Sequence, residues 1–223
     1  MMKLKTLALA TSIALSAMSV AGTAQAGALA TSVLDITNFT LSRGGTLLDF
    51  NTDFSGRISP TNSADISASL NGTTKSDTQN GVGQDIDLNH LNATVGVPIP
   101  GYVENSYFAY TAPPALGTSF ALADQSQFGS PITNLPDTVN GGVVSNPATA
   151  STAAYVSLDD QGVGSSSANN ALQAGFTFAL NHGGPIDFKF DARAYLEAFT
   201  APGSNFPTNA ESQYSLLFTI RDL

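Results

Sequence analysis

The segment Ile186-Asp187-Phe188-Lys189-Phe190-Asp191-Ala192-Arg193-Ala194-Tyr195-Leu196-Glu197 alternates between apolar and polar residues over its whole length. A period of two is typical of a β-strand, because successive side chains point to opposite faces of a sheet. The even positions are apolar, and the odd positions carry charges that alternate in sign from Asp187 to Arg193. We therefore expect a long strand with one face in the core and a ladder of charges on the other.

Two further segments near the C-terminal end alternate in the same way. Residues 172–180 and residues 214–220 both have apolar side chains at every even position. Turn-forming residues at 181–185 and a loop with Pro and Gly at 200–210 separate the three runs. A helix does not explain the pattern, because residues two positions apart do not share a helix face. The sequence therefore predicts three antiparallel strands in this part of the chain.

Shorter apolar runs recur in the earlier part of the chain, with turn-rich segments such as 42–45, 71–74 and 140–142 between them. These runs are residues 32–41, 46–54, 64–70, 102–110, 119–123 and 153–158. Regularly spaced short strands are typical of an all-β antiparallel β-sandwich or jelly roll, and we expect about nine or ten strands in two sheets. Two polar segments, 75–83 and 162–170, are predicted to be loops.

The first 26 residues have the three parts of a secretory signal peptide. Lys3 and Lys5 form a charged start, and an apolar run of small residues follows at 7–20. That run, at roughly 14 residues, is too short for a helix that spans a bilayer. Ala24-Gln25-Ala26 then provides a small-x-small cleavage site, with Gly27 directly after it.

Cleavage after Ala26 would leave residues 27–223 as a single β-sandwich domain, long enough to bury a core of its own. We expect this domain to be secreted. The Ala-rich, cysteine-free composition favours a bacterial source.

Charged residues are scarce, at 11% of the chain against about 25% in an average domain. The net charge is −9 and there is no cysteine. The lack of cysteine excludes a disulfide scaffold, thiolate chemistry and a cysteine zinc site. With only 8 Lys and Arg residues, the chain has too few basic groups for the patch that nucleic acids need, so no nucleic-acid partner is expected.

No segment matches a catalytic or cofactor motif. The two histidines, His90 and His182, lie far apart in the sequence, so no His-x-x-x-His metal spacing exists. Ser165–Ser167 lacks the Gly-x-Ser-x-Gly pattern of a nucleophilic serine. Gly81-Val82-Gly83 has no following lysine of the kind that a phosphate loop uses. We therefore predict no catalytic residue, no cofactor and a non-enzymatic protein.

Three pairs of carboxylates raise the question of glycoside hydrolysis, which needs two such groups across a cleft. The pairs are Asp85 and Asp87, Asp159 and Asp160, and Asp187 and Asp191. The last pair shares a strand face with Lys189 and Arg193, which is typical of a surface charge ladder. Spacing alone does not establish a catalytic pair in the other two.

Calcium is the ion that best suits this composition, because extracellular β-sandwiches bind it through Asp and Asn oxygens on loops. Asp85, Asp87 and Asn89 alternate and would present their oxygens on one side. The segment lacks the full Asp-x-Asp-x-Asp-Gly loop. The sequence leaves calcium binding open and assigns no metal ligand.

A carbohydrate-binding sandwich is the second function that the sequence allows. Sugar sites combine exposed aromatic rings with polar groups, and Tyr102, Tyr107, Phe108 and Tyr110 are the candidates for such rings. The simpler interpretation is that these residues alternate between the two faces of one strand. The chain has no Trp, which weakens the case for a lectin. A polysaccharide-cleaving jelly roll is a third and less favoured hypothesis.

Three segments resemble a known family. Residues 28–41 (Ala-Leu-Ala-Thr-Ser-Val-Leu-Asp-Ile-Thr-Asn-Phe-Thr-Leu), residues 175–196 and the closing residues 214–222 are similar to bacterial exosortase-dependent surface proteins of the EDSAP type. The resemblance rests on short strand patterns and implies display on the surface or in the matrix of biofilm-forming bacteria, so the cell surface of a Gram-negative bacterium is the expected location. It supplies no active site.

Proteins of that family end in a PEP-CTERM sorting tail, with a Pro-Glu-Pro segment, an apolar helix and a basic end. These 223 residues contain none of the three, and we expect the chain to be a fragment cut before the tail or a secreted relative without one. The resemblance implies exopolysaccharide or other surface proteins as partners, with membrane attachment only through such an anchor. The leading hypothesis is therefore an exported surface or matrix protein with a structural or interaction role.

Overall fold

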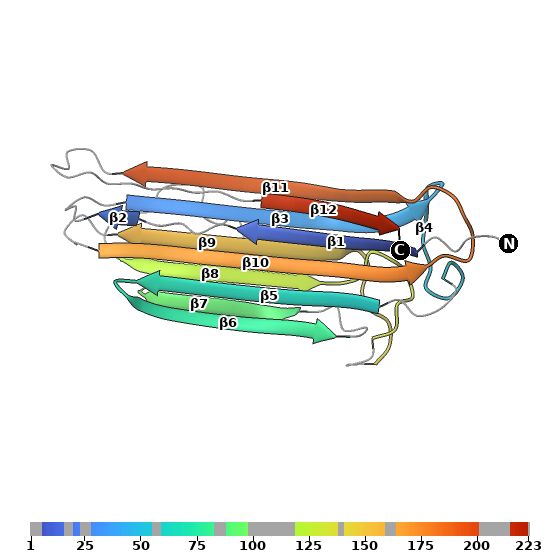
Figure 1. Cartoon of the computed structure of the whole chain (residues 1–223), viewed down its shortest axis with the longest axis horizontal. Coiled ribbons are helices and arrows are strands. Elements are labelled where there is room, and N and C mark those ends of the chain that lie inside the picture. The colour runs from blue at the N-terminus through green and yellow to red at the C-terminus, as the bar shows by residue number, and fades with distance from the viewer. Residues whose placement is uncertain are drawn as a thin grey trace.

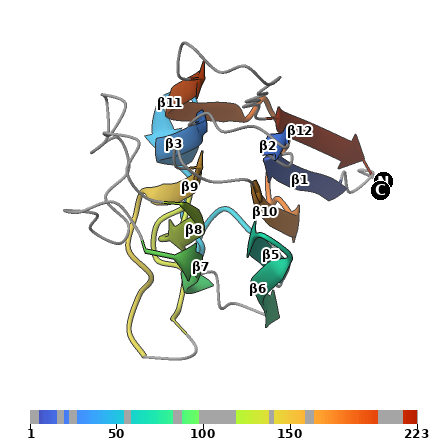
Figure 2. The same cartoon turned by 90° about the vertical axis from the view of Figure 1, so that its left-hand side faces the viewer.

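The predicted antiparallel β-sandwich is confirmed by a computed structural model of the chain, in which two sheets lie side by side as layers (Figures 1 and 2). The structure describes residues 6–15, 20–22, 28–54, 59–82, 88–97, 119–137, 141–158, 164–200 and 215–222. Within these ranges there is no helix long and apolar enough to span a membrane.

Within the described ranges each sheet has six strands, and every pair of neighbouring strands is antiparallel. Sheet A has the order β12-β1-β10-β5-β6, with the short β2 also beside β10, and sheet B has the order β11-β3-β9-β8-β7, with the short β4 also beside β3. The strands of sheet A are β1 (Thr6–Leu15), β2 (Val20–Gly22), β5 (Ser59–Leu70), β6 (Thr73–Val82), β10 (Gly164–Ala179) and β12 (Ser215–Asp222). Those of sheet B are β3 (Ala28–Arg43), β4 (Thr46–Leu47), β7 (Leu88–Gly96), β8 (Phe120–Phe128), β9 (Ala148–Leu158) and β11 (Asp187–Thr200).

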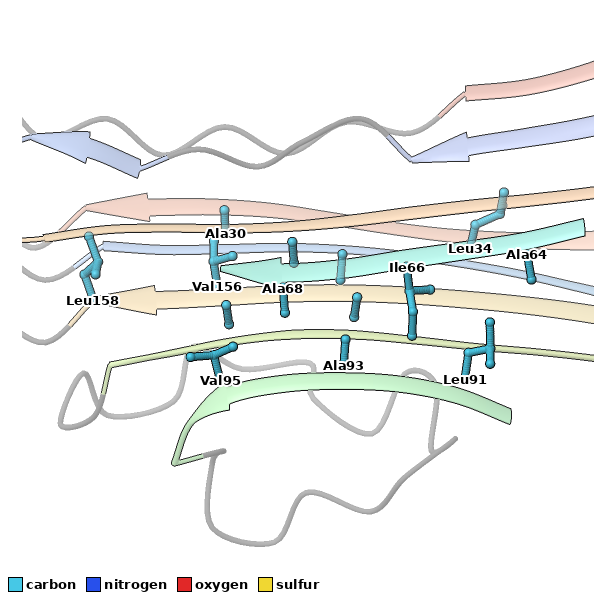
Figure 3. Packing of buried hydrophobic residues seen from close by; sticks show 14 of the residues in the cluster. Ala30, Leu34, Ala64, Ile66, Ala68, Leu91, Ala93, Val95, Val156 and Leu158 are labelled. Carbon is cyan, nitrogen blue, oxygen red and sulfur yellow. The ribbon is translucent and has the colours of Figure 1, made fainter. Parts of the chain in front are cut away.

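Small side chains bring the two sheets close together. The main core cluster consists mostly of alanine from both sheets, with Ile66, Leu91 and Val156 among its larger members (Figure 3). Strands β5 and β10 of sheet A accordingly approach β7, β8 and β9 of sheet B to within 8 Å between Cα atoms, against the usual spacing of about 10 Å between packed sheets. The alanine-rich composition is thus explained by a thin core.

A second core cluster fills one end of the sandwich. It combines strand ends with loop residues: Leu41, Leu48, Phe54, Ile132, Leu135, Val144 and Phe178. The rings of Phe54 and Phe178 meet edge to face, with centroids 5.5 Å apart and an interplanar angle of 87°, a preferred geometry for aromatic pairs. This cluster supports the loops described in the next subsection.

Strands β8 and β9 and the first part of β3 are buried on both of their faces. Leu34 and Ile36 of β3 point into the main core, so the alternate residue Val33 points to the outer face. There it joins a third cluster with Phe120, Leu122, Ala153 and Tyr155, all at most 3% exposed. Because both faces of β8 and β9 are buried, their sequences lack the alternation that identifies β11.

The predicted strand at 186–197 exists as β11, but only the first part of its apolar face packs against the core. Phe188 and Phe190 are half-buried against the core clusters. Ala192 and Ala194 are exposed, and Leu196 is 44% exposed. These residues are exposed because β11 is the end strand of sheet B, whereas the close contacts with sheet A are made by β7, β8 and β9.

Two segments predicted to be loops are strands instead. Residues 75–83 fall largely within β6, and residues 162–170 largely within β10. Strand β6 forms because Asn71 and Gly72, with φ of 49° and 81°, make a tight turn that returns the chain antiparallel to β5. Its residues 73–78 are exposed on both faces, so no hydrophobic alternation marks it.

Two other expectations about strands also change. The run at 46–54 is a strand only at Thr46–Leu47, and turn residues follow at 50–53. The runs identified in the sequence do not include β7, although its residues Leu91, Ala93 and Val95 alternate and are buried. The predicted strand at 102–110 lies outside the described residues.

The segment predicted to be a signal peptide contributes two strands to sheet A. Strand β1 lies between β10 and β12, and β2 lies beside the start of β10. The cleavage residues Ala24, Ala26 and Gly27 lie outside the described residues, so cleavage and the domain of 27–223 stay predictions. Strand β3 begins at Ala28, immediately after Gly27.

Candidate functional site

Three loop segments meet at the end of the sandwich that carries β4 (Figure 1). Residues 44–54 follow β3, residues 129–137 follow β8, and residues 180–186 join β10 to β11. Backbone hydrogen bonds connect them: Thr133 N–H donates to Leu48 O at 2.9 Å, and Asn181 N–H donates to Asp53 O at 2.9 Å. We call this region the loop cluster.

The carboxylate of Asp49 lies at the centre of the loop cluster. Its Oδ1 accepts a hydrogen bond from the backbone N–H of Asn51 at 2.8 Å. Its Oδ2 accepts from the side-chain amide of Asn134 and from the Thr133 hydroxyl. The hydrogen bonds from Asn134 and then from the Asn51 backbone hold the pKa of Asp49 below its usual 3.8, because they favour the ionised form.

Asp53 and Arg43 extend this network to the third loop. Asp53 Oδ2 accepts from the backbone N–H of Asp49 at 2.8 Å, and its Oδ1 lies 3.7 Å from a guanidinium nitrogen of Arg43. Arg43 also donates to the carbonyl oxygen of His182 at 3.1 Å. The side chain of Asn181 donates to Thr52 O at 2.9 Å.

The loop cluster is built to hold backbone in place. The carboxylates of Asp49 and Asp53 accept hydrogen bonds from amide groups, and Asp53 also lies beside the Arg43 guanidinium. Sequence reasoning missed this cluster, although the spacing Asp49-x-Asn51-x-Asp53 was a usable signal. Among the residues that the structure describes, no three His, Cys, Asp or Glu side chains gather in a way that could hold a metal ion.

The outer face of sheet B carries a second group of polar residues. In the strand register Arg193, Asp35, Ser151 and Ser126 lie side by side across β11, β3, β9 and β8. Ser151 donates its hydroxyl to Asp35 Oδ1. Ser126 and Ser151 are at most 7% exposed, and the neighbouring Asp124 is 1% exposed. The β8 and β9 end of this row is therefore buried, whereas Arg193 at its β11 end is exposed.

Tyr195 and Glu197 continue the outer face along β11. The Tyr195 hydroxyl donates to Glu197 Oε2 at 2.7 Å. This hydrogen bond, with burial and the charge of Glu197, raises the pKa of Tyr195 above its usual 10.0. Both side chains are half-buried, so the pair orders the edge of the sheet rather than presenting a reactive group.

The interior contains polar side chains without partners. Gln125 and Thr152 lie opposite one another on β8 and β9 and are 1% and 0% exposed. Neither the Gln125 amide nor the Thr152 hydroxyl makes a hydrogen bond within the described part of the chain. They face the main core, because Ala123 and Ala154 at the alternate positions belong to it.

The charged residues of β11 form a regular ladder on the protein surface. Asp187, Lys189, Asp191 and Arg193 are all exposed, as the sequence predicted. The side-chain amide of Asn38 on β3 donates to Asp191 Oδ2 at 2.7 Å. Because Asp187 and Asp191 lie on an open strand among basic residues, they do not form a pair across a cleft.

The other candidates from the sequence are scattered or undescribed. His182 is exposed in the β10–β11 connection, where its carbonyl group rather than its ring has the contact recorded above. His90 and Asn89 lie in β7, and Ser165–Ser167 lie in β10. The calcium candidates Asp85 and Asp87, the pair Asp159 and Asp160, and the aromatic residues Tyr102, Tyr107, Phe108 and Tyr110 lie outside the described residues.

Comparisons with known proteins place no family on this fold. No protein-family model matches the chain, and neither a curated protein nor a solved structure matches it.

Proposed function

We propose that this chain is an exported bacterial protein of the cell surface or extracellular matrix, with a structural or interaction role and no catalysis. The observation that carries the proposal is the place of the expected cleavage site in the fold. Gly27 directly precedes β3, which begins at Ala28 and lies between β9 and β11 in sheet B. Cleavage after Ala26 would therefore free the chain from its leader without cutting any strand of sheet B.

The surface chemistry supports this proposal. The β5–β6 hairpin from Asn71 to Thr78 is exposed and polar, and β11 presents alternating charges. Such surfaces are well hydrated and suit a protein outside the cell. The carboxylates of Asp49 and Asp53 brace loops instead of meeting across a cleft, which favours a structural role over hydrolysis.

The segments that resemble EDSAP-type surface proteins add support for surface display. Two of them, residues 28–41 and residues 175–196, supply most of β3 and β11, which pair along most of their length. In this proposal the partners are exopolysaccharide or other surface proteins, contacted through exposed strands.

Expression of the full chain with a C-terminal epitope in a Gram-negative host tests export. We expect the protein outside the cytoplasm with Gly27 as its N-terminal residue, read by N-terminal sequencing. Ala24→Arg and Ala26→Arg should block cleavage, because both positions require small residues, whereas Gln25→Arg should be cleaved normally. Retention of an uncleaved wild-type chain in the cytoplasm would overturn the proposal.

A second experiment separates a polysaccharide-binding matrix role from the polysaccharide-cleaving hypothesis. Purified protein is incubated with bacterial exopolysaccharides, and both co-sedimentation and polymer length are measured. Binding without shortening supports a matrix role with a polysaccharide partner. Shortened polymer would instead establish a polysaccharide-cleaving enzyme.

A further inference from the structure

Among the described residues, strand β11 has one ladder partner, which is β3. No strand of the described residues pairs with its other edge. An end strand of 14 residues presents a long row of backbone N–H and C=O groups, which is a template for pairing with another strand. Natural proteins usually protect such an edge with charges that repel a second copy.

The charges of β11 are arranged differently. About Phe190, each charge is matched by the opposite charge at the same distance on the other side: Lys189 by Asp191, and Asp187 by Arg193. In an antiparallel pair of identical strands centred on Phe190, Asp187 therefore lies directly opposite Arg193 of the second copy. Lys189 lies opposite the second copy's Asp191 in the same way.

Residues directly opposite in an antiparallel pair have Cβ atoms about 4.5–5.5 Å apart, close enough for opposite charges to attract. All four charged residues lie at alternate positions along β11, so their side chains share one face of the strand. A register shifted by two residues in either direction places like charges opposite one another, Asp187 against Asp191 or Lys189 against Arg193. The charge pattern thus selects one register and disfavours its nearest alternatives.

The same register also covers the exposed apolar positions of β11. Ala192 and Ala194 are exposed, although the alternation of the sequence predicts a buried face. In the pair centred on Phe190, Ala192 lies opposite Phe188 of the second copy, and Ala194 lies opposite its Ile186. Phe188 and Ile186 are half-buried at the edge of the second core cluster, so the pairing extends that cluster across the two copies.

We propose that two copies of this chain associate edge to edge through β11, antiparallel and centred on Phe190, so that their B sheets form one continuous sheet. The two-fold axis at Phe190 makes the contact self-complementary, as a closed dimer requires. This inference goes beyond the proposed function, because it depends only on β11 and is tested on purified protein. A failure of export therefore leaves it untouched.

The test is a charge exchange followed by sedimentation velocity on the full 223-residue chain. The acidic variant carries Lys189→Glu and Arg193→Glu, and the basic variant carries Asp187→Lys and Asp191→Lys. Each variant alone should be monomeric, because every opposed pair then has like charges. An equimolar mixture of the two should form dimers again. Circular dichroism confirms that both variants keep the wild-type fold.

A matched control changes charges on the end strand of sheet A. Lys75→Glu and Asp77→Lys alter exposed residues of β6 and should leave the wild-type dimer unchanged. A monomeric wild-type protein, or dimers that persist in both charge variants, would overturn the proposal.

A cysteine cross-link tests the register itself, and the natural chain has no cysteine to interfere. Phe190→Cys places the new thiol opposite its own copy and should give a disulfide-linked dimer on oxidation. Ala198→Cys, on the same strand but away from the axis, should stay unlinked. Equal cross-linking of the two variants would contradict pairing centred on Phe190.

Discussion

Asn38 donates its side-chain amide to Asp191 Oδ2 at 2.7 Å, at the point where the register between β3 and β11 shifts. Asn38 has a positive φ of 54°, a conformation that Asn tolerates better than most residues because its short side chain bonds locally. The extra residue of β3 at this point forms a β-bulge, which increases the local twist of the strand pair. One residue therefore sets both the backbone geometry and the position of one charge on the β11 ladder.

Asn38→Ala should destabilise the protein by about 1–2 kcal/mol, the cost of a left-handed conformation for a residue other than Gly, plus the loss of the hydrogen bond to Asp191. Asn38→Gly should cost less, because glycine adopts the same φ without strain. Urea unfolding followed by circular dichroism measures both. Equal losses for the two variants would show that φ at this position does not limit stability.

Strand β11 shows how much of the fold the sequence predicts. Strict alternation from Ile186 to Leu196 identifies β11 as a strand, and the turn-forming residues at 181–185 mark its start. Together with the other alternating runs, it indicates an all-β fold. The alternation does not reveal that Ala192 and Ala194 are exposed, because burial depends on where the strand lies in the sheet. Strand β6 shows the opposite case: its residues are polar on both faces, and pairing with β5 through the Asn71-Gly72 turn makes it a strand.

The loop cluster could not be predicted as a site for a different reason. Residues 43–53, Asn134 and residues 181–182 come from three separate parts of the sequence and meet only after the strands between them have folded. No local pattern encodes which loops share one end of a sandwich. Only the part of the cluster that lies within one loop is visible in the sequence, as the spacing of Asp49, Asn51 and Asp53.

The pKa of Asp49 gives stability a dependence on acidic pH. Because its folded pKa lies below the usual 3.8, Asp49 contributes stability above its unfolded pKa and loses it as pH falls through the folded pKa. Asp49→Asn should therefore flatten the loss of stability on acidification below about pH 5. Urea unfolding of wild type and variant across this range measures the difference. Parallel curves would contradict a stabilising role for the ionised carboxylate.

Thr152→Val should stabilise the protein. The Thr152 hydroxyl is fully buried and makes no hydrogen bond in the described part of the chain. Removing an unsatisfied buried hydroxyl should recover about 1–3 kcal/mol, since valine has nearly the same shape. Thermal unfolding measures the change.

Ser130→Ala is the control for that substitution. Ser130 is also fully buried, but its Oγ accepts a hydrogen bond from the backbone N–H of Ile132 at 3.1 Å. Its removal should lower stability, because a buried N–H loses its acceptor. A loss of stability in Thr152→Val comparable to that in Ser130→Ala would show that the Thr152 hydroxyl has a partner in solution.

Removal of residues 1–26 should change the pairing of β12. Strand β1 lies between β10 and β12, so cleavage after Ala26 takes away the ladder partner of β12. Through β1, Leu216 is in register with Leu172 of β10, and Ile220 with Phe176. A sideways move of one strand spacing, about 4.8 Å, would therefore bring β12 onto β10 in parallel without a shift along the strand.

Hydrogen exchange on the cleaved protein and on the uncleaved Ala26→Arg variant tests this expectation. Amides of β12 should be protected in both proteins, because β12 gains β10 as a partner when β1 is removed. An engineered cysteine pair, Leu217→Cys with Gln173→Cys, should form a disulfide only in the cleaved protein, since both residues are opposite Ser12 of β1 in the uncleaved chain. Unprotected β12 amides after cleavage would show that this strand depends on residues 6–15 for its place in sheet A.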